Sequence, residues 1–224
     1  MRLAAWCGIA FVLLSGVIVV LSPFWPPLGA STAEVVAYYR DHRIAFLIGN
    51  FIAIGAAVPS FAQIAALCML IKKAEGEHGW LWLAVLGAAL LAHAVGALAL
   101  VAYQVVPFEL DAGQEAVARG FNDFAGVAFA SFLLILTGFV GFASWAVLST
   151  ACLPRWFGLS GIPLAVFCLH ASAGALTSEP RWLAGGGLAS AAVTSLFFLW
   201  CGALSVLFLR GDYLGAPSRT PIAS

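Results

Sequence analysis

Residues 82–106, WLAVLGAALLAHAVGALALVAYQVV, contain no Lys, Arg, Asp or Glu and place one histidine, His93, near their middle. A membrane-spanning helix needs about 20 consecutive apolar residues, and this run is long enough to supply them. The stretch therefore predicts a transmembrane helix that begins at Leu81. The rest of the chain is best interpreted around it.

One side of this helix is made of small residues. Ala84, Ala88, Ala92 and Gly96 recur every four positions, so they share a face along which a neighbouring helix can approach closely. His93 lies beside this stripe. We expect such a helix to lie inside a bundle rather than among lipid.

The composition of the whole chain is that of a membrane protein. Of its 224 residues, 63% are hydrophobic and 9% are charged, whereas a soluble domain carries roughly 25% charged residues. We predict an all-α polytopic transmembrane bundle formed by residues 1–210 as a single domain, with residues 211–224 as a short polar tail. The formal net charge is zero and there is no basic cluster, which argues against nucleic acid as a partner.

The apolar runs predict six membrane-spanning helices plus a short interfacial helix after the first span. The interfacial helix is expected to begin after Ser31, which has capping-box spacing to Glu34. Its two tyrosines, Tyr38 and Tyr39, are expected at the level of the lipid headgroups. Residues 107–120 are expected to form the second sizeable connection, with one more surface turn of helix after Asp111. The expected spans cover about residues 3–22, 44–71, 81–106, 121–150, 157–176 and 183–209.

The distribution of basic residues predicts an orientation. An even number of spans places both termini on the same side of the membrane. The face with the termini then carries six Lys or Arg residues and the opposite face carries four, and cytoplasmic loops have an excess of these residues. We therefore expect a multi-pass protein of the plasma (bacterial inner) membrane with both termini cytoplasmic.

Two segments resemble a known group of proteins. They are AEVVAYYRDHR, residues 33–43, and LPRWFGLSGIPLA, residues 153–165. Both are similar to segments of a broad group of uncharacterised six-helix bacterial membrane proteins, of a type often seen in actinobacteria. The resemblance implies the same architecture over most of the chain. The group has no agreed activity or site residues, so the resemblance leaves the function open.

Two histidines are candidates for chemistry inside the membrane. His93 and His170 each lie 14 residues from the cytoplasmic end of a span, counted from Gly79 and Trp156, which is roughly 21 Å at about 1.5 Å per residue. The two spans run in the same direction, so the imidazoles are expected at similar depth. Such a pair is compatible with axial ligation of a b-type haem, with another metal or with a proton relay. The interpretation that we favour is two neutral structural histidines, each hydrogen-bonded within the bundle, because one pair can match in depth by chance.

A second group of polar residues lies near the opposite, outer face. Asn50, Tyr103, Gln104, Asn122 and Asp123 fall within a few turns of that face. Together they are candidates for a polar mouth over an apolar interior, which is the usual composition of a small-molecule site. For Asn122 and Asp123 we favour the alternative of helix capping, because Asn and Asp are preferred at N-caps and a carboxylate suits the helix dipole.

Three functional hypotheses follow. The first, which we favour, is a non-catalytic bundle that binds a lipophilic small molecule or serves as a subunit of a membrane assembly, with membrane lipid and other membrane subunits as partners. The second is a redox protein that binds haem b through His93 and His170. The third is a small inverted-repeat transporter. Hydrolase, P-loop and dinucleotide-binding motifs do not occur in the sequence, which favours a protein that is not an enzyme.

Overall fold

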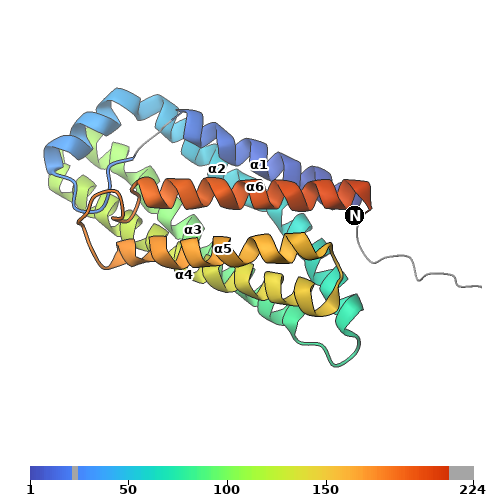
Figure 1. Ribbon diagram of the computed structural model, residues 1–224. Helices are drawn as coiled ribbons and strands as arrows, with labels where there is room; N and C mark the ends of the chain where they lie inside the picture. The colour runs from blue at the N-terminus through green and yellow to red at the C-terminus, as the bar shows by residue number, and fades with distance from the viewer. Residues whose placement is uncertain (22–24, 212–224) are drawn as a thin grey trace, which may run out of the picture.

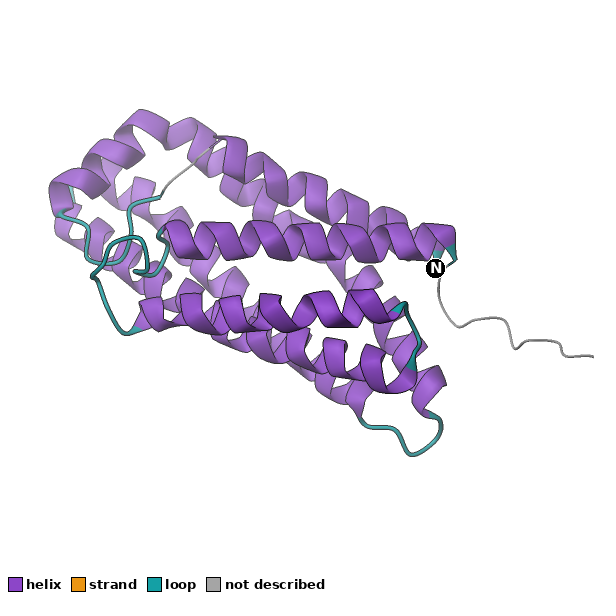
Figure 2. Ribbon diagram, viewed as in Figure 1, coloured by secondary structure: helices purple, strands orange, loops and turns teal. Residues whose placement is uncertain are grey.

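The structure is a computed structural model that describes residues 1–21 and 25–211. Six helices of the described residues are long and apolar enough to cross a membrane, and Figure 2 shows helix and loop throughout the described chain. The predicted all-α polytopic bundle is confirmed, and the chain is a multi-pass integral membrane protein. Most of the predicted polar tail lies outside the described residues. The helices are α1 (Arg2–Leu21), α2 (Thr32–Glu75), α3 (Leu81–Asp111), α4 (Glu115–Thr150), α5 (Arg155–Ser172) and α6 (Leu188–Arg210), with a short 3-10 turn, η1 (Ala173–Ala175), after α5.

The helices form a ring in which each packs against the next. Each of the helices α1 to α5 contacts its successor along the chain, and α6 closes the ring by packing against α1 (Figure 1). We call the end of the bundle with Arg2 the N-terminal end, and the end with the α1–α2, α3–α4 and α5–α6 connections the far end. The α2–α3, α3–α4 and α4–α5 connections are short, and short connections between antiparallel neighbours favour this up-and-down order.

The helix predicted after Ser31 forms, but it is not a separate element. Ser31 accepts a hydrogen bond from the Glu34 backbone N–H, and the Glu34 carboxylate accepts one from the Ser31 backbone N–H, as a capping box requires. The helix then continues into the second span because residues 32–48 contain no Gly or Pro to end it. The 44 residues of α2 are roughly 66 Å long at about 1.5 Å per residue, roughly twice the hydrocarbon thickness. Its first turns therefore extend beyond the membrane core at the far end.

The predicted connection at residues 107–120 is mostly helical, so its predicted length is wrong; the helical turn expected after Asp111 forms, but as the start of α4. α3 continues through Pro107 to Asp111, and α4 already begins at Glu115. Two ion pairs to α2 fix these helix ends: Arg40 with Glu115 at 3.2 Å, and Arg43 with Asp111. The helix ends were predicted from the ends of the apolar runs. Ion pairs between charged side chains outside the hydrocarbon let these helices continue past those runs.

The last connection also differs from the expectation. α6 begins at Leu188, five residues after the predicted start at Leu183, and the residues before it fold back onto the bundle. Gly185 accepts a hydrogen bond from the Leu28 N–H at 2.8 Å and donates one to the Gly174 carbonyl at 3.0 Å. Gly186 has a φ of +82°, which a glycine adopts readily and other residues do not. The three consecutive glycines thus form a close-packed loop rather than the first turn of a helix.

Two clusters of buried side chains hold the ring together. One fills the N-terminal half and includes Leu67, Phe139 and Trp200. The other lies at the far end and includes Tyr39 and Tyr103. The two clusters are separate. The space between them contains the cavity that is the candidate for a functional site.

Candidate functional site

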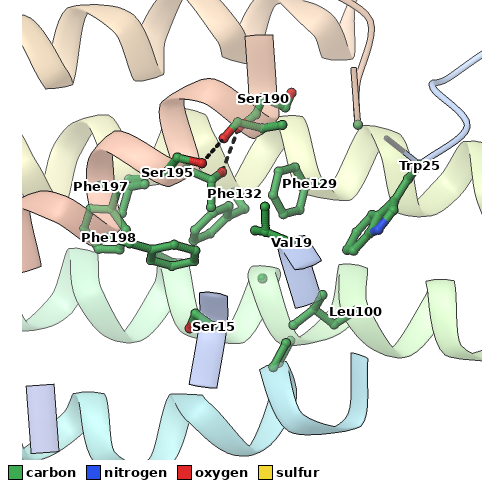
Figure 3. A pocket seen from close by; sticks show the side chains of 18 of the residues that line it. Ser15, Val19, Trp25, Leu100, Phe129, Phe132, Ser190, Ser195, Phe197 and Phe198 are labelled. Atoms are coloured by element: carbon green, nitrogen blue, oxygen red, sulfur yellow. Dashed lines mark hydrogen bonds between the residues drawn. The ribbon is translucent and has the colours of Figure 1, made fainter. Parts of the chain in front are cut away.

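A chamber of about 500 Å³ lies inside the ring, between the two buried clusters (Figure 3). Its walls come from α1, α2, α3, α4 and α6, and from residues 181–187 at the far end. Small side chains on α3 leave the space open, because Ala92, Gly96 and Ala97 all line it. Ala92 and Gly96 of the predicted small-residue stripe therefore border a cavity as well as the neighbouring helix α4. At Gly96, an added Cβ would lie 3.2 Å from the ring of Phe132 across the α3–α4 contact.

Aromatic rings form much of the wall. Phe11, Phe139 and Phe197 close the chamber toward the N-terminal end, with edge-to-face contacts between Phe11 and Phe197 at 6.4 Å and between Phe139 and Phe197 at 6.2 Å. Phe129 and Phe132 face the chamber from α4 (Figure 3). Edge-to-face ring pairs are stabilising, so the contacts among Phe11, Phe139 and Phe197 stabilise the apolar wall at this end of the chamber.

The polar groups at the chamber are few and mostly uncharged. Ser15 lines it from α1, and Thr194 and Ser195 line it from α6. Thr194 donates to the Ser190 carbonyl at 2.8 Å and Ser195 donates to the Ala191 carbonyl at 2.9 Å. Their hydroxyl hydrogens are therefore engaged with their own helix, and their oxygen lone pairs remain available as acceptors.

His93 is the predicted site residue that lines the chamber. Its Nε2 lies 2.6 Å from the Ser60 hydroxyl on α2, and its Nδ1 lies 2.8 Å from the Ala89 carbonyl one turn earlier. The ring of Phe61 covers it at 4.7 Å. Both ring nitrogens are thus held by the protein, which is the arrangement expected for a structural histidine.

His170 lies elsewhere. It is exposed at the end of α5 and stacks on Trp182, with ring centroids 6.1 Å apart, and α5 contributes no described residue to the chamber wall. His93 and His170 therefore do not face a common cavity, and a ligand held by His93 in the chamber would not meet His170. This geometry gives the haem hypothesis no support.

The predicted polar mouth is a set of contacts between helices. Asn50 donates to the Leu100 carbonyl at 2.8 Å and to the Gln104 side-chain oxygen at 2.6 Å, which links α2 to α3. Asn50 is fully buried, and neither Asn50 nor Gln104 lines the chamber. Hydrogen bonds of this kind, from a side-chain amide on one helix to a neighbouring helix, help to hold membrane bundles together.

The remaining three candidates have the same role at the far end. Asn122 accepts from the Tyr39 hydroxyl at 3.2 Å and donates to the Pro26 carbonyl at 3.3 Å. Asp123 accepts from the Gly29 backbone N–H at 3.0 Å. Tyr103 is fully buried behind Trp25, with ring centroids 4.6 Å apart. These contacts attach the α1–α2 connection to the bundle.

The alternative of N-capping for Asn122 and Asp123 is wrong. α4 begins at Glu115, so both residues lie about two turns inside the helix. Their side chains instead bind backbone groups of residues 26–29.

Sequence reasoning missed most of the chamber. The aromatic residues and the hydroxyl groups of α6 were not predicted as site residues, because each is common in a membrane helix. The available signal was the concentration of small residues from Gly185 in the preceding loop to Ser195 on α6, which resembles the small-residue stripe of α3. Two such faces in one bundle leave volume unfilled unless large side chains compensate.

Within the described residues, no group of three or more His, Cys, Asp or Glu is placed to hold a metal ion. All five cysteines are free thiols. Comparison of the chain with protein-family models, with curated proteins and with solved structures finds no match. The resemblance noted for residues 33–43 and 153–165 therefore stays a prediction, and the chamber itself is the basis for assigning a function.

Proposed function

We propose that this membrane protein is a non-catalytic bundle that binds one lipophilic small molecule in the chamber between α1, α3, α4 and α6. The observation that carries the proposal is the chamber of about 500 Å³. Small-molecule sites measure about 300–1,000 Å³ and are lined mainly by apolar and aromatic side chains with a few polar groups. The chamber has this size and this lining.

The distribution of charge favours a ligand without a strong charge in its buried part. Among the described residues that line the chamber, Arg181 at the far end is the one with a permanent charge, and no acid lines it. A buried charge on the ligand would lose its hydration and find no partner of opposite sign deeper in. The acceptor oxygens of Thr194 and Ser195 suit a ligand that carries a hydroxyl or another neutral donor.

The same features weigh against the two alternatives. A coupled transporter usually places an acid or base near the membrane midplane, and at the chamber only His93 is of that kind, with both nitrogens already bound. A redox protein of the predicted type needs His93 and His170 at one site. We further propose that the far end faces outward and that the protein lies in the plasma membrane, following the predicted orientation.

The test is retention of an uncharged fluorescent probe, 1-aminoanthracene, by the purified protein. Ala97→Trp places a large ring in the chamber, since Ala97 lines it, and we expect loss of probe binding. Ala94→Trp is the matched control, because Ala94 is on the same helix, is exposed and does not line the chamber. Mass spectrometry of the lipid extract of wild-type protein should identify the natural occupant.

Equal binding by wild type, Ala97→Trp and Ala94→Trp would show that the chamber is not the binding site. An absorbance spectrum of the same preparation examines the haem alternative. We expect a colourless protein, and a stoichiometric Soret band that disappears in His93→Ala and in His170→Ala would replace our proposal with the redox hypothesis.

A further inference from the structure

The chamber is covered at the far end. The loop before α6 lies over it, held by the Leu28 and Gly174 backbone contacts of Gly185. Arg181 in the same loop forms a two-pronged ion pair with Glu34 at the start of α2, at 2.8 and 2.7 Å. This cover joins the α5–α6 connection to both the α1–α2 connection and α2, so a route past it would be bordered by backbone and by the Arg181–Glu34 ion pair.

The wall is open on a different side. Apart from Arg181 and Trp182 in the covering loop, the lining residues that are themselves exposed lie on two helices. Val19 is 50% exposed near the end of α1, and Leu188 is 56% exposed at the start of α6. Ala191 and Ser195 follow on the same face of α6 and are also exposed. Residues that are both exposed and part of the wall mark the border of an opening.

The opening lies where α1 and α6 separate. The two helices touch toward the N-terminal end: an added Cβ at Gly8 would lie 2.3 Å from the Ser205 hydroxyl, and the rings of Phe11 and Phe198 are 5.5 Å apart. The helices are antiparallel, so this register brings Val19 to the level of Ala191. Their ribbons diverge toward the far end in Figure 1, and the chamber occupies the space between them.

We infer that the gap between the outer halves of α1 and α6 is a lateral entrance, through which an uncharged lipophile passes from the bilayer into the chamber. This inference rests on the proposed function and adds the source and class of the ligand. The border residues Val19, Leu188, Ala191 and Ser195 are apolar or small and carry no charge. They suit a hydrocarbon-rich molecule already dissolved in the membrane, whereas a route past the covering loop would be bordered by the charged Arg181–Glu34 pair.

The test uses a cysteine reporter, Ala97→Cys, in protein reconstituted into phosphatidylcholine vesicles. An uncharged long-chain alkyl maleimide reaches the chamber through the bilayer, and a sulfonated maleimide reaches it only through water. We expect several-fold faster labelling by the alkyl reagent, followed at peptide level so that the native cysteines do not interfere. In this background, Ala191→Trp should slow labelling several-fold, and Ala192→Trp should not, because Ala192 is exposed but does not line the chamber.

The outcomes separate this inference from the proposed function. Equal rates in the Ala191→Trp and Ala192→Trp proteins, or faster labelling by the sulfonated reagent, would overturn the lateral entrance. Either result would leave the proposed function intact if Ala97→Trp still abolished probe retention. If Ala97→Trp still retains the fluorescent probe, both the proposed function and the lateral entrance are contradicted, because the probe then does not bind in the chamber.

Discussion

At the scale of single residues, His93 is the side chain at which polar chemistry and the chamber meet. A neutral imidazole has one N–H and one acceptor nitrogen. If Nδ1 donates to the Ala89 carbonyl, Nε2 is the acceptor nitrogen, and the single hydroxyl hydrogen of Ser60 is shared between Nε2 and the Ala57 carbonyl, each 2.6 Å away. His93 then links α2 to α3 beside the chamber as a neutral side chain. A neutral histidine avoids the free-energy cost of placing a charge inside the membrane.

Removing the hydroxyl partner should destabilise the protein. In Ser60→Ala, Nε2 of His93 loses its hydrogen bond in a buried setting, and leaving a buried polar atom unpaired costs about 1–3 kcal/mol. We expect a lower Tm in detergent. Ser149→Ala is the control, because Ser149 is exposed and bonds only within its own helix, to the Trp145 and Ala146 carbonyls. Similar Tm values for the two variants would mean that the His93–Ser60 contact contributes nothing.

Glu34 gives a prediction for pH. The hydrogen bonds from Arg181 and Ser31 lower the pKa of Glu34 from 4.5 to about 2, at the first turn of α2, beyond the hydrocarbon. A carboxylate whose pKa is lower in the folded state stabilises that state above its unfolded pKa and loses this effect as the pH falls through the folded pKa. We therefore expect Glu34→Gln to lower Tm above pH 4.5 and the difference from wild type to shrink toward pH 2.

The control for this pH series is Glu77→Gln, since Glu77 lies in an exposed turn at the N-terminal end. A Tm difference between wild type and Glu34→Gln that is constant over the whole pH range would contradict the ion pair. The stabilisation itself should be small, because the side chains of Arg181 and Glu34 are 51% and 47% exposed and exposed pairs contribute little.

At the scale of helices, one junction joins α1, α2 and α6. Gln63 on α2 donates to the Cys201 carbonyl and to the Ser205 hydroxyl on α6, both at 2.8 Å. Gly8 on α1 lies against this pair, and its lack of a side chain makes room for the amide. Small residues let membrane helices approach closely enough for such bonds to form. The junction closes the ring below the proposed entrance.

Adding one methyl group at this junction should disturb it. In Gly8→Ala, the new Cβ would lie 2.3 Å from both the Gln63 amide nitrogen and the Ser205 hydroxyl, and overpacking of this kind costs about 1–3 kcal/mol. Gly16→Ala on the same helix is the control, since nothing lies within 4 Å of its added Cβ. We expect a lower Tm for Gly8→Ala and an unchanged or higher Tm for Gly16→Ala. The opposite order would place the contact between α1 and α6 elsewhere.

The helices were more predictable than their ends or their contacts. An apolar run long enough to cross a bilayer has few alternatives to a helix, and all six spans could be predicted on that basis. The continuous start of α4 could not, because Glu115 and Arg119 are polar and only a separate surface turn is expected after Asp111, yet Glu115 pairs with Arg40 and Arg119 with Asp123. The partners of Asn122 were equally hidden, since Tyr39 and Pro26 are distant in sequence.

At the scale of the whole molecule, the chamber results from a mismatch between two faces. The N-terminal half of the ring is filled by large side chains such as Phe139 and Trp200. Further toward the far end, α3 and α6 both present small residues, and the aromatic rings of α4 do not fill the space between them. No single stretch of sequence encodes this void, because its walls come from five helices. Composition therefore predicted the bundle but not the cavity.

The orientation of the molecule can be tested at the two ends of the ring. The described N-terminal end carries Arg2, Lys72, Lys73, Arg155 and Arg210, and the far end carries four arginines. Because cytoplasmic loops are richer in Lys and Arg, we expect the far end to face outward. A membrane-impermeant maleimide should label Ala116→Cys at the far end in intact cells. Glu77→Cys, exposed at the N-terminal end, should react only after the membrane is opened, with the unmodified protein as the background for the native cysteines. Labelling of Glu77→Cys but not of Ala116→Cys in intact cells would contradict the proposed orientation. The far end would then face the cytoplasm, and the entrance between α1 and α6 would lie in the cytoplasmic leaflet.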